Sequence, residues 1–163
     1  MLTQARVKEL FHYDPIVGVF IRKVPASWSK IGDISTGLDG KGYRRVSIDG
    51  KRYSEHRLAW FYMNGDWPPE EIDHINGSPT DNSFENLRLA NRKENLRNTK
   101  VSKNNKCGLK GVSWHSCSKR WRARFFHKGK EVNLGLYDTP EAAHAAYAAA
   151  SVREFGEFAR VFN

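Results

Sequence analysis

Cysteines are scarce and apolar segments are short in this sequence, and both features exclude classes of protein. The two cysteines, Cys107 and Cys117, form no CxxC pair, so neither a disulfide framework nor a zinc ribbon is expected. No apolar run approaches the roughly 20 residues that cross a bilayer, and the N-terminus lacks the apolar core of a secretion signal. We therefore expect a protein of the reducing cytoplasm with no membrane partner.

Acidic residues are missing from one long segment, although the chain as a whole carries a net charge of +9. Residues 51–100 hold eight Lys or Arg and eight Asp or Glu, whereas residues 101–130 hold nine Lys or Arg and no acid. A basic segment of this kind is typical of binding to a phosphate backbone. The charge pattern predicts a nucleic-acid partner, and nothing in the sequence implies a protein partner.

Hydrophobic periodicity and turn residues divide the 163 residues into a β-rich N-terminal unit with a second motif (1–98), a polar basic linker (99–106) and a C-terminal domain (107–163). Asp49-Gly50 predicts a hairpin turn, and Thr139 followed by Pro140 predicts the start of a helix that ends at Gly156. The expected helices are 2–11, 56–63, 92–98 and 140–155, and the expected strands are 18–22, 43–48, 51–54, 111–114, 120–126 and 131–135.

Side chains alternate along the predicted strand 120–126. Trp121, Ala123 and Phe125 share one face, which suits packing under the alanine-rich C-terminal helix. Arg122 and Arg124 then lie on the opposite face, where an arginine pairs well with guanine in the major groove of duplex DNA. We expect a three-stranded antiparallel sheet with a helix on one face and DNA on the other.

The candidate catalytic and metal-binding residues lie between residues 72 and 98. Phosphodiester hydrolysis requires a hard divalent cation with oxygen ligands and a base that takes a proton from water. Asp73 and His74 are adjacent, so at the end of a strand one side chain can face a metal and the other the attacking water. Asn95 can supply a further oxygen ligand, and Asn86 can brace the intervening loop.

This segment resembles the ββα-metal finger of HNH endonucleases of the phage and intron-homing type: Asp73-His74, Asn86-Leu87-Arg88 and then Asn95. The resemblance implies His74 as the general base, Asn86 as the structural asparagine of the catalytic site, and Asp73 and Asn95 as ligands of Mg²⁺ or Mn²⁺. Asn95 replaces the histidine of the literal motif and matches the asparagine-bearing variant. We interpret His56 as a buried, bracing residue, and we expect Arg57, Arg88 and Arg97 to contact phosphates.

The C-terminal segments Gly111-Val112-Ser113-Trp114, Trp121-Arg122-Ala123-Arg124 and Leu134-Gly135-Leu136-Tyr137 resemble the APETALA-two/ethylene-response-factor domain, which binds DNA through its sheet. Several positions that are usually basic in that family hold other residues here, so its target sequence does not transfer. The residues that the resemblance and the strand alternation implicate in DNA binding are Lys110, Ser113, His115, Arg122, Arg124, Phe126 and Asn133.

The sequence therefore predicts an α+β protein in which a ββα-metal finger nuclease module is joined to a three-stranded antiparallel sheet packed on one helix. The predicted function is metal-dependent cleavage of double-stranded DNA by a homing or phage-encoded endonuclease, with nicking as one mode. It would act in the cytoplasm or nucleoid of a host cell. Two alternatives stay open at this point: a non-catalytic DNA-binding regulator with a degenerate finger, and an RNA-binding protein.

Overall fold

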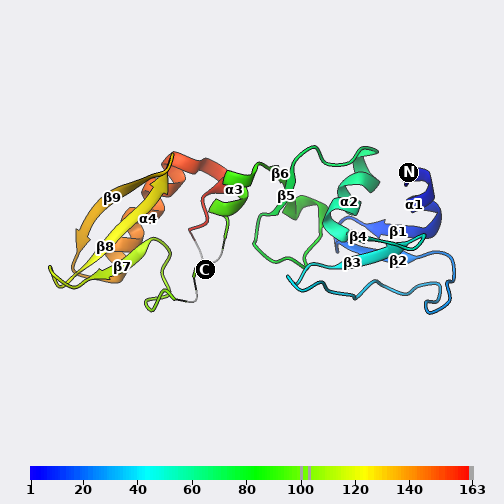
Figure 1. Ribbon diagram of the computed structural model, residues 1–163, viewed down its shortest axis with the longest axis horizontal. Helices are drawn as coiled ribbons and strands as arrows, with labels where there is room; N and C mark the ends of the chain where they lie inside the picture. The colour runs from blue at the N-terminus through cyan, green and yellow to red at the C-terminus, as the bar shows by residue number, and fades with distance from the viewer. Residues whose placement is uncertain (100, 103, 162–163) are drawn as a thin grey trace. The chain divides into compact units, whose positions relative to one another are not determined.

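The computed structural model describes residues 1–99, 101–102 and 104–161. The chain forms two compact units, Met1–Arg92 and Lys93–Asn163 (Figure 1). The division falls inside a short helix, whereas the predicted domain boundary lies at residue 98; that boundary stays a prediction. The predicted linker 99–106 includes residues 100 and 103, which lie outside the described residues.

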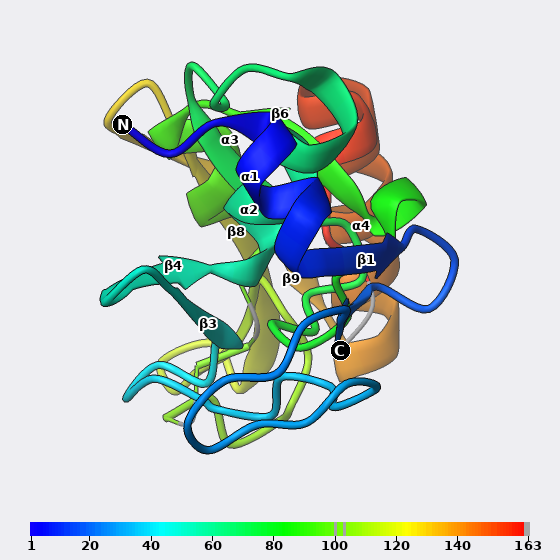
Figure 2. The same cartoon turned by 90° about the vertical axis from the view of Figure 1, so that its right-hand side faces the viewer.

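The first unit combines helices with three two-stranded antiparallel sheets, in which β1 pairs with β2, β3 with β4 and β5 with β6. Helices α1 and α2 lie side by side (Figures 1 and 2). In chain order the elements are α1 (Gln4–Leu10), β1 (Phe11–Asp14), β2 (Val19–Arg22), β3 (Arg45–Ile48), β4 (Lys51–Ser54), α2 (Glu55–Asn64), β5 (Glu71–His74), η1 (Phe84–Asn86) and β6 (Leu87–Ala90).

Local sequence explains how these elements begin and end. The Thr3 hydroxyl accepts a hydrogen bond from the amide of Arg6 (3.2 Å) and caps α1. Asp49 and Gly50 both have positive φ values (47° and 77°), as the tight turn between β3 and β4 requires. Phe11, predicted to continue the first helix, instead starts β1. Its extended backbone (φ −137°) pairs with Arg22, and its buried ring meets Phe20 edge-on.

The core of the first unit gathers side chains from all of its helices and strands except the short η1 turn. Val7, Phe20 and Leu58 are fully buried, and they represent α1, β2 and α2 respectively. α2 ends at Asn64, one residue beyond the predicted end, because Gly65 adopts a left-handed conformation after it. The core therefore packs the hairpins β1–β2 and β3–β4 against α2, the helix that precedes β5.

The second unit is a three-stranded antiparallel sheet in the order β7-β8-β9, covered on one face by α4 (Figure 1). Its inner face packs Val112 and Ala123 against Ala143 and Tyr147 of α4, as the alternation predicted. Thr139 caps α4 and Pro140 opens it. The elements are α3 (Arg92–Arg97), which begins at the last residue of the first unit, β7 (Val112–His115), β8 (Arg120–His127), β9 (Lys130–Tyr137), α4 (Pro140–Phe155) and η2 (Gly156–Phe158).

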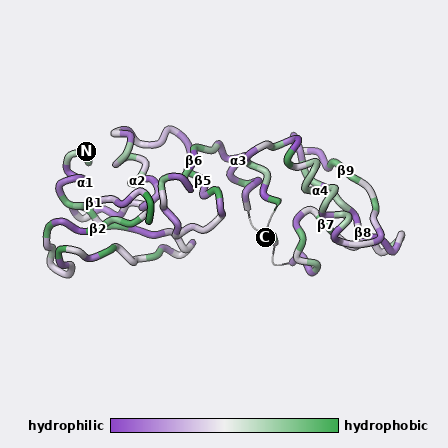
Figure 3. The backbone as a smooth tube through the Cα atoms, turned by 180° about the vertical axis from the view of Figure 1, so that it is seen from behind, coloured by the Kyte–Doolittle hydropathy of each residue, from purple (hydrophilic) through white to green (hydrophobic). Residues whose placement is uncertain are grey.

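Hydrophobic and hydrophilic residues follow each other closely along the coloured part of the trace (Figure 3). None of the helices among the described residues is long and apolar enough to cross a membrane.

Candidate active site and nucleic-acid interface

The hairpin β5–β6 carries the predicted metal ligand Asp73 and the predicted general base His74. Asp73 lies opposite Arg88 and His74 lies opposite Leu87 in this antiparallel pair. Because neighbouring residues in a strand point to opposite faces, the carboxylate and the imidazole diverge. Both side chains are buried, so each needs polar partners from the protein in place of water.

Asp73 forms an ion pair across the hairpin. Its Oδ2 accepts hydrogen bonds from Nε (2.9 Å) and Nη2 (2.7 Å) of Arg88, and both side chains are largely shielded from solvent. A charge-assisted contact of this kind fixes the carboxylate and offsets the cost of burying it. Arg88, predicted to contact DNA phosphate, is thus also a partner of the predicted metal ligand.

A buried chain of hydrogen bonds orients His74. Glu55 Oε2 accepts from the Asn82 amide nitrogen (3.3 Å), which leaves Asn82 Oδ1 facing His74 Nε2 at 3.0 Å. An amide oxygen only accepts, so Nε2 carries the proton of the neutral imidazole and donates it to this bond. Nδ1 is then the unprotonated nitrogen, the one that can take a proton from water.

Burial keeps this histidine neutral. It lowers the pKa of His74, and the opposing effects of the Asn82 hydrogen bond and the Asp73 charge are smaller. His56 packs edge-on against it, with ring centroids 5.3 Å apart. Burial, assisted by His74, lowers the pKa of His56 to about 3. His56 is buried, as we interpreted it, and acts as an uncharged neighbour of the candidate base.

The N-terminal hairpin β1–β2 supports the loop that carries Asn82. The Tyr13 hydroxyl donates to the Asn82 carbonyl (2.6 Å), and the Phe84 amide donates to the Pro15 carbonyl (2.8 Å). Gly18 adopts a φ of +75°, and a Cβ there would lie 2.1 Å from the Ser83 amide nitrogen. The turn between β1 and β2 therefore lies directly against this loop.

Asn86 ties the two ends of the same loop together. Its Oδ1 accepts from the Asn76 amide (2.9 Å), and its Nδ2 donates to the Asp81 carbonyl (2.8 Å). Its own carbonyl accepts from the Ile75 amide (2.9 Å). Asn86 thus has the geometry of a bracing residue immediately beyond His74.

The oxygen donors predicted to bind metal have the right chemistry for a hard divalent cation, since a carboxylate and an amide oxygen suit Mg²⁺ and Mn²⁺. Asp73 belongs to the first unit and Asn95, on α3, to the second, so their joint binding of a metal stays a prediction. Among the described residues, no three His, Cys, Asp or Glu side chains cluster in a way that would hold a metal ion.

Three residues predicted to bind DNA also make contacts within their own unit. Arg57 donates to the carbonyls of Glu70 (3.0 Å) and Pro68 (3.2 Å), in the turn before β5. The Arg97 guanidinium stacks 4.2 Å from the ring centroid of Phe155. Lys110 donates to the carbonyls of Arg97 (2.5 Å) and Thr99 (2.7 Å), and burial lowers its pKa to about 8. Their contacts with DNA stay predictions.

The outward face of the second unit gathers most of the other predicted residues. Ser113 lies opposite Arg122, and Arg124 lies opposite Asn133. Phe126 is well exposed on the same face, and His115 at the end of β7 bonds the Ser118 hydroxyl (3.0 Å).

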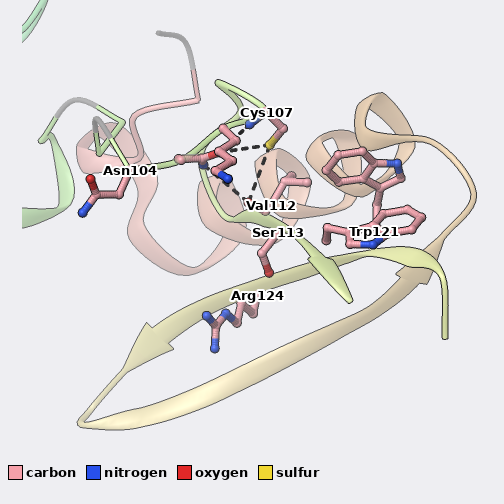
Figure 4. Close-up of a pocket in the computed structure, with 9 residues that line it drawn as sticks. Asn104, Cys107, Val112, Ser113, Trp121 and Arg124 are labelled. Atoms are coloured by element: carbon pink, nitrogen blue, oxygen red, sulfur yellow. Dashed lines mark hydrogen bonds between the residues drawn. The ribbon is translucent and has the colours of Figure 1, made fainter. Parts of the chain in front are cut away.

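A hollow of about 570 Å³ borders this face along β7. In Figure 4 the Ser113 side chain points toward Arg124, on the side of β7 away from Cys107. The sheet thus presents polar and basic side chains together on the surface opposite its helix.

Comparisons with known proteins agree with both parts of this arrangement. Residues 53–97 match the HNH endonuclease family, and residues 107–154 match the AP2 domain. The chain is therefore an HNH endonuclease, a phosphodiester hydrolase acting on DNA, with a following DNA-binding domain.

A relative makes the family assignment more specific. Protein 3.8 of Escherichia phage T7 is 40% identical over 107 residues, which cover 64% of this chain and 87% of the phage protein. The chain belongs to the same family as this phage protein. No solved structure matches it. Both resemblances inferred from the sequence are confirmed.

The residues that hold His74 were not predicted from the sequence. Asn82 and Glu55 are separated by 27 positions, and Asn82 stands in an Asx-rich stretch that indicates only turns. The Asp81-Asn82 pair gave no separate signal, because the importance of Asn82 comes from its burial rather than its neighbours in sequence.

Proposed function

We propose that this chain is a metal-dependent endonuclease of the homing or phage-encoded type, which cuts one strand of duplex DNA at each encounter. The observation that carries the proposal is the orientation of His74 by Asn82, which leaves Nδ1 as the accepting nitrogen of a buried, neutral imidazole. The phage origin of the relative supports the phage-encoded part.

In the proposed reaction His74 Nδ1 takes a proton from water while the water oxygen forms a bond to phosphorus. The bond from phosphorus to the leaving oxygen breaks in line with the attack, and that oxygen receives a proton from solvent. Asp73 and Asn95 would hold a Mg²⁺ or Mn²⁺, which supplies neutralisation of the charge that develops on the phosphate and the leaving oxygen. Asn82 holds the neutral imidazole in the tautomer whose Nδ1 can accept this proton.

The outward face of β7–β9 would hold the duplex. A twisted antiparallel sheet fits the major groove, and arginines on it can pair bidentately with guanine. Each chain has one Asp73-His74 pair and hence one active centre. A double-strand break would then require two chains or two successive events, which is why nicking is the proposed mode.

Conversion of supercoiled plasmid tests the proposal. Wild-type protein with Mg²⁺ or Mn²⁺, incubated with a supercoiled plasmid that carries DNA from its native host, should produce nicked circles first and linear DNA later. His74→Ala should produce neither while still retarding the DNA. His12→Ala, which removes an exposed histidine from β1, is the matched control and should cut like wild type. Equal cutting by His74→Ala would overturn the assignment of the base, and linear product without a nicked intermediate would overturn the nicking mode.

A further inference from the structure

The outward face of the C-terminal sheet carries an acid among the residues expected to meet DNA. Glu131 on β9 is the first acidic residue after the acid-free segment 101–130, and it lies directly opposite Phe126. It shares this face with Arg122, Arg124 and Asn133. A carboxylate is repelled by a phosphate backbone, so its position needs a reason other than affinity for DNA.

Its contacts supply that reason. Glu131 Oε2 accepts a hydrogen bond from Nη1 of Arg124, and Oε1 lies 4.0 Å from Nη1 of Arg122. All three side chains are between a quarter and a little over a third exposed, so the ion pairs are half-shielded while the guanidinium groups stay accessible. One carboxylate thus constrains both arginines.

Two further polar atoms on this face are left without a partner. Among the described residues, Ser113 Oγ and Arg122 Nε are shielded from solvent and form no hydrogen bond. Ser113 and Arg122 are cross-strand neighbours. On this face Glu131 therefore holds the Arg124 guanidinium by a hydrogen bond and lies near that of Arg122. Ser113 Oγ and Arg122 Nε can still donate hydrogen bonds to a ligand.

We propose that Glu131 is a positioning residue for DNA sequence recognition: it holds Arg124, and to a lesser degree Arg122, in the orientation that pairs with a base edge. It also keeps both guanidinium groups from contacting phosphates indiscriminately. An arginine with fixed orientation loses less conformational freedom on binding and discriminates more strongly than one that swings freely. This inference rests on the proposed binding of DNA by the sheet face.

Glu131→Gln tests the inference, because it removes the charge while keeping the shape. A half-exposed ion pair adds little to stability, so the variant should fold like wild type. Glu141→Gln on α4 is the matched control, since it removes the same charge from an exposed site in the same unit, away from the arginines. Full-length proteins are compared in a chelator of divalent metals, so that binding is measured without cleavage.

Two probes give separate readouts: a 30-base-pair duplex of mixed sequence, and the sequences enriched by wild type from a randomised duplex pool. For Glu131→Gln we expect roughly fivefold tighter binding to the mixed duplex. The binding constant should also fall more steeply as the salt concentration rises, by the amount expected for about one additional phosphate contact. Preference for the enriched sequences should fall by about fivefold or more. Glu141→Gln should preserve that preference.

A double substitution separates positioning from other effects. If Glu131 acts through Arg124, replacing Glu131 in an Arg124→Gln background should change preference less than twofold. An undiminished effect in that background, or a Glu131→Gln variant that behaves like Glu141→Gln, would overturn the inference alone. If wild type binds neither probe, DNA binding by the sheet face fails and the inference fails with it.

Discussion

The two units of the chain differ in whether they bury carboxylate and imidazole side chains. The first unit buries Glu55, His56, Asp73, His74 and Asn82. The second unit builds its core from small apolar and aromatic side chains, and its described Lys, Arg, Asp and Glu side chains are half-buried or exposed. Burial in the first unit controls protonation and orientation, as hydrolysis requires. Exposure in the second leaves charges available to a polyanion, as recognition requires.

Among substitutions that test this difference between the units, the loss of the Asn82 side chain should have the largest effect on stability and nicking. Asn82→Ala leaves Glu55 and His74 buried without their shared partner, which should cost about 1–3 kcal/mol of unfolding free energy. The imidazole of His74 would also lose the hydrogen bond that selects its tautomer, so the nicking rate should fall about tenfold to hundredfold. Urea unfolding and single-turnover nicking measure the two effects. Asn104→Ala, at an exposed position of the second unit, serves as control. Nicking at the wild-type rate by Asn82→Ala would contradict the role of Asn82 in orienting His74.

Gly18→Ala tests how closely the N-terminal hairpin supports the active-site loop. The added Cβ would lie 2.1 Å from the Ser83 amide nitrogen, so the loop must shift. Gly50→Ala is a close control, because Gly50 has nearly the same φ (77° against 75°) and open space around it. The left-handed conformation costs both variants about 1 kcal/mol. Only Gly18→Ala should lose more unfolding free energy than this and also nick DNA more slowly. Equal losses of unfolding free energy in the two variants would show that the close approach of Gly18 to Ser83 is unimportant.

Acid should destabilise the first unit through His56. The pKa of this residue falls from an ordinary value near 6.5 to about 3 on folding. Between these values the unfolded chain binds a proton that the folded chain does not, so stability is lost as the pH falls from about 6.5 to about 3. One such group gives a slope of up to about 1.4 kcal/mol per pH unit.

Urea unfolding of wild type and His56→Leu at several pH values measures this slope. The variant cannot take up the proton, so its stability should depend less on pH across the same range. Parallel curves for the two proteins would exclude His56 as the source.

The smallest effect is expected from the exposed charges of the second unit. Arg120 Nε donates to Asp138 Oδ1 (2.9 Å), and both side chains are more than 40% exposed. Arg120→Gln should therefore change the unfolding free energy by less than about 0.5 kcal/mol. A loss as large as that of Asn82→Ala would remove the distinction between the units.

Local patterns predicted much of the fold. The cap at Thr3, the turn at Asp49-Gly50 and the start of α4 at Thr139-Pro140 each depend on a few consecutive residues, and the structure has all three. Phe11 was misplaced because an apolar residue after a short helix suits either a helix face or a strand. Only its pairing with Arg22 and its contact with Phe20 decide between them.

The sequence by itself determined the two classes of domain, the Asp73-His74 pair and the inner and outer faces of the C-terminal sheet. These features follow from motifs and from a period of two residues, which are local. Only the tertiary structure decided that Asn82 orients His74, that Arg88 neutralises Asp73 and that Glu131 holds Arg124. The first of these depends on Tyr13, 69 positions from Asn82, and a contact between distant residues exists only after the chain has folded.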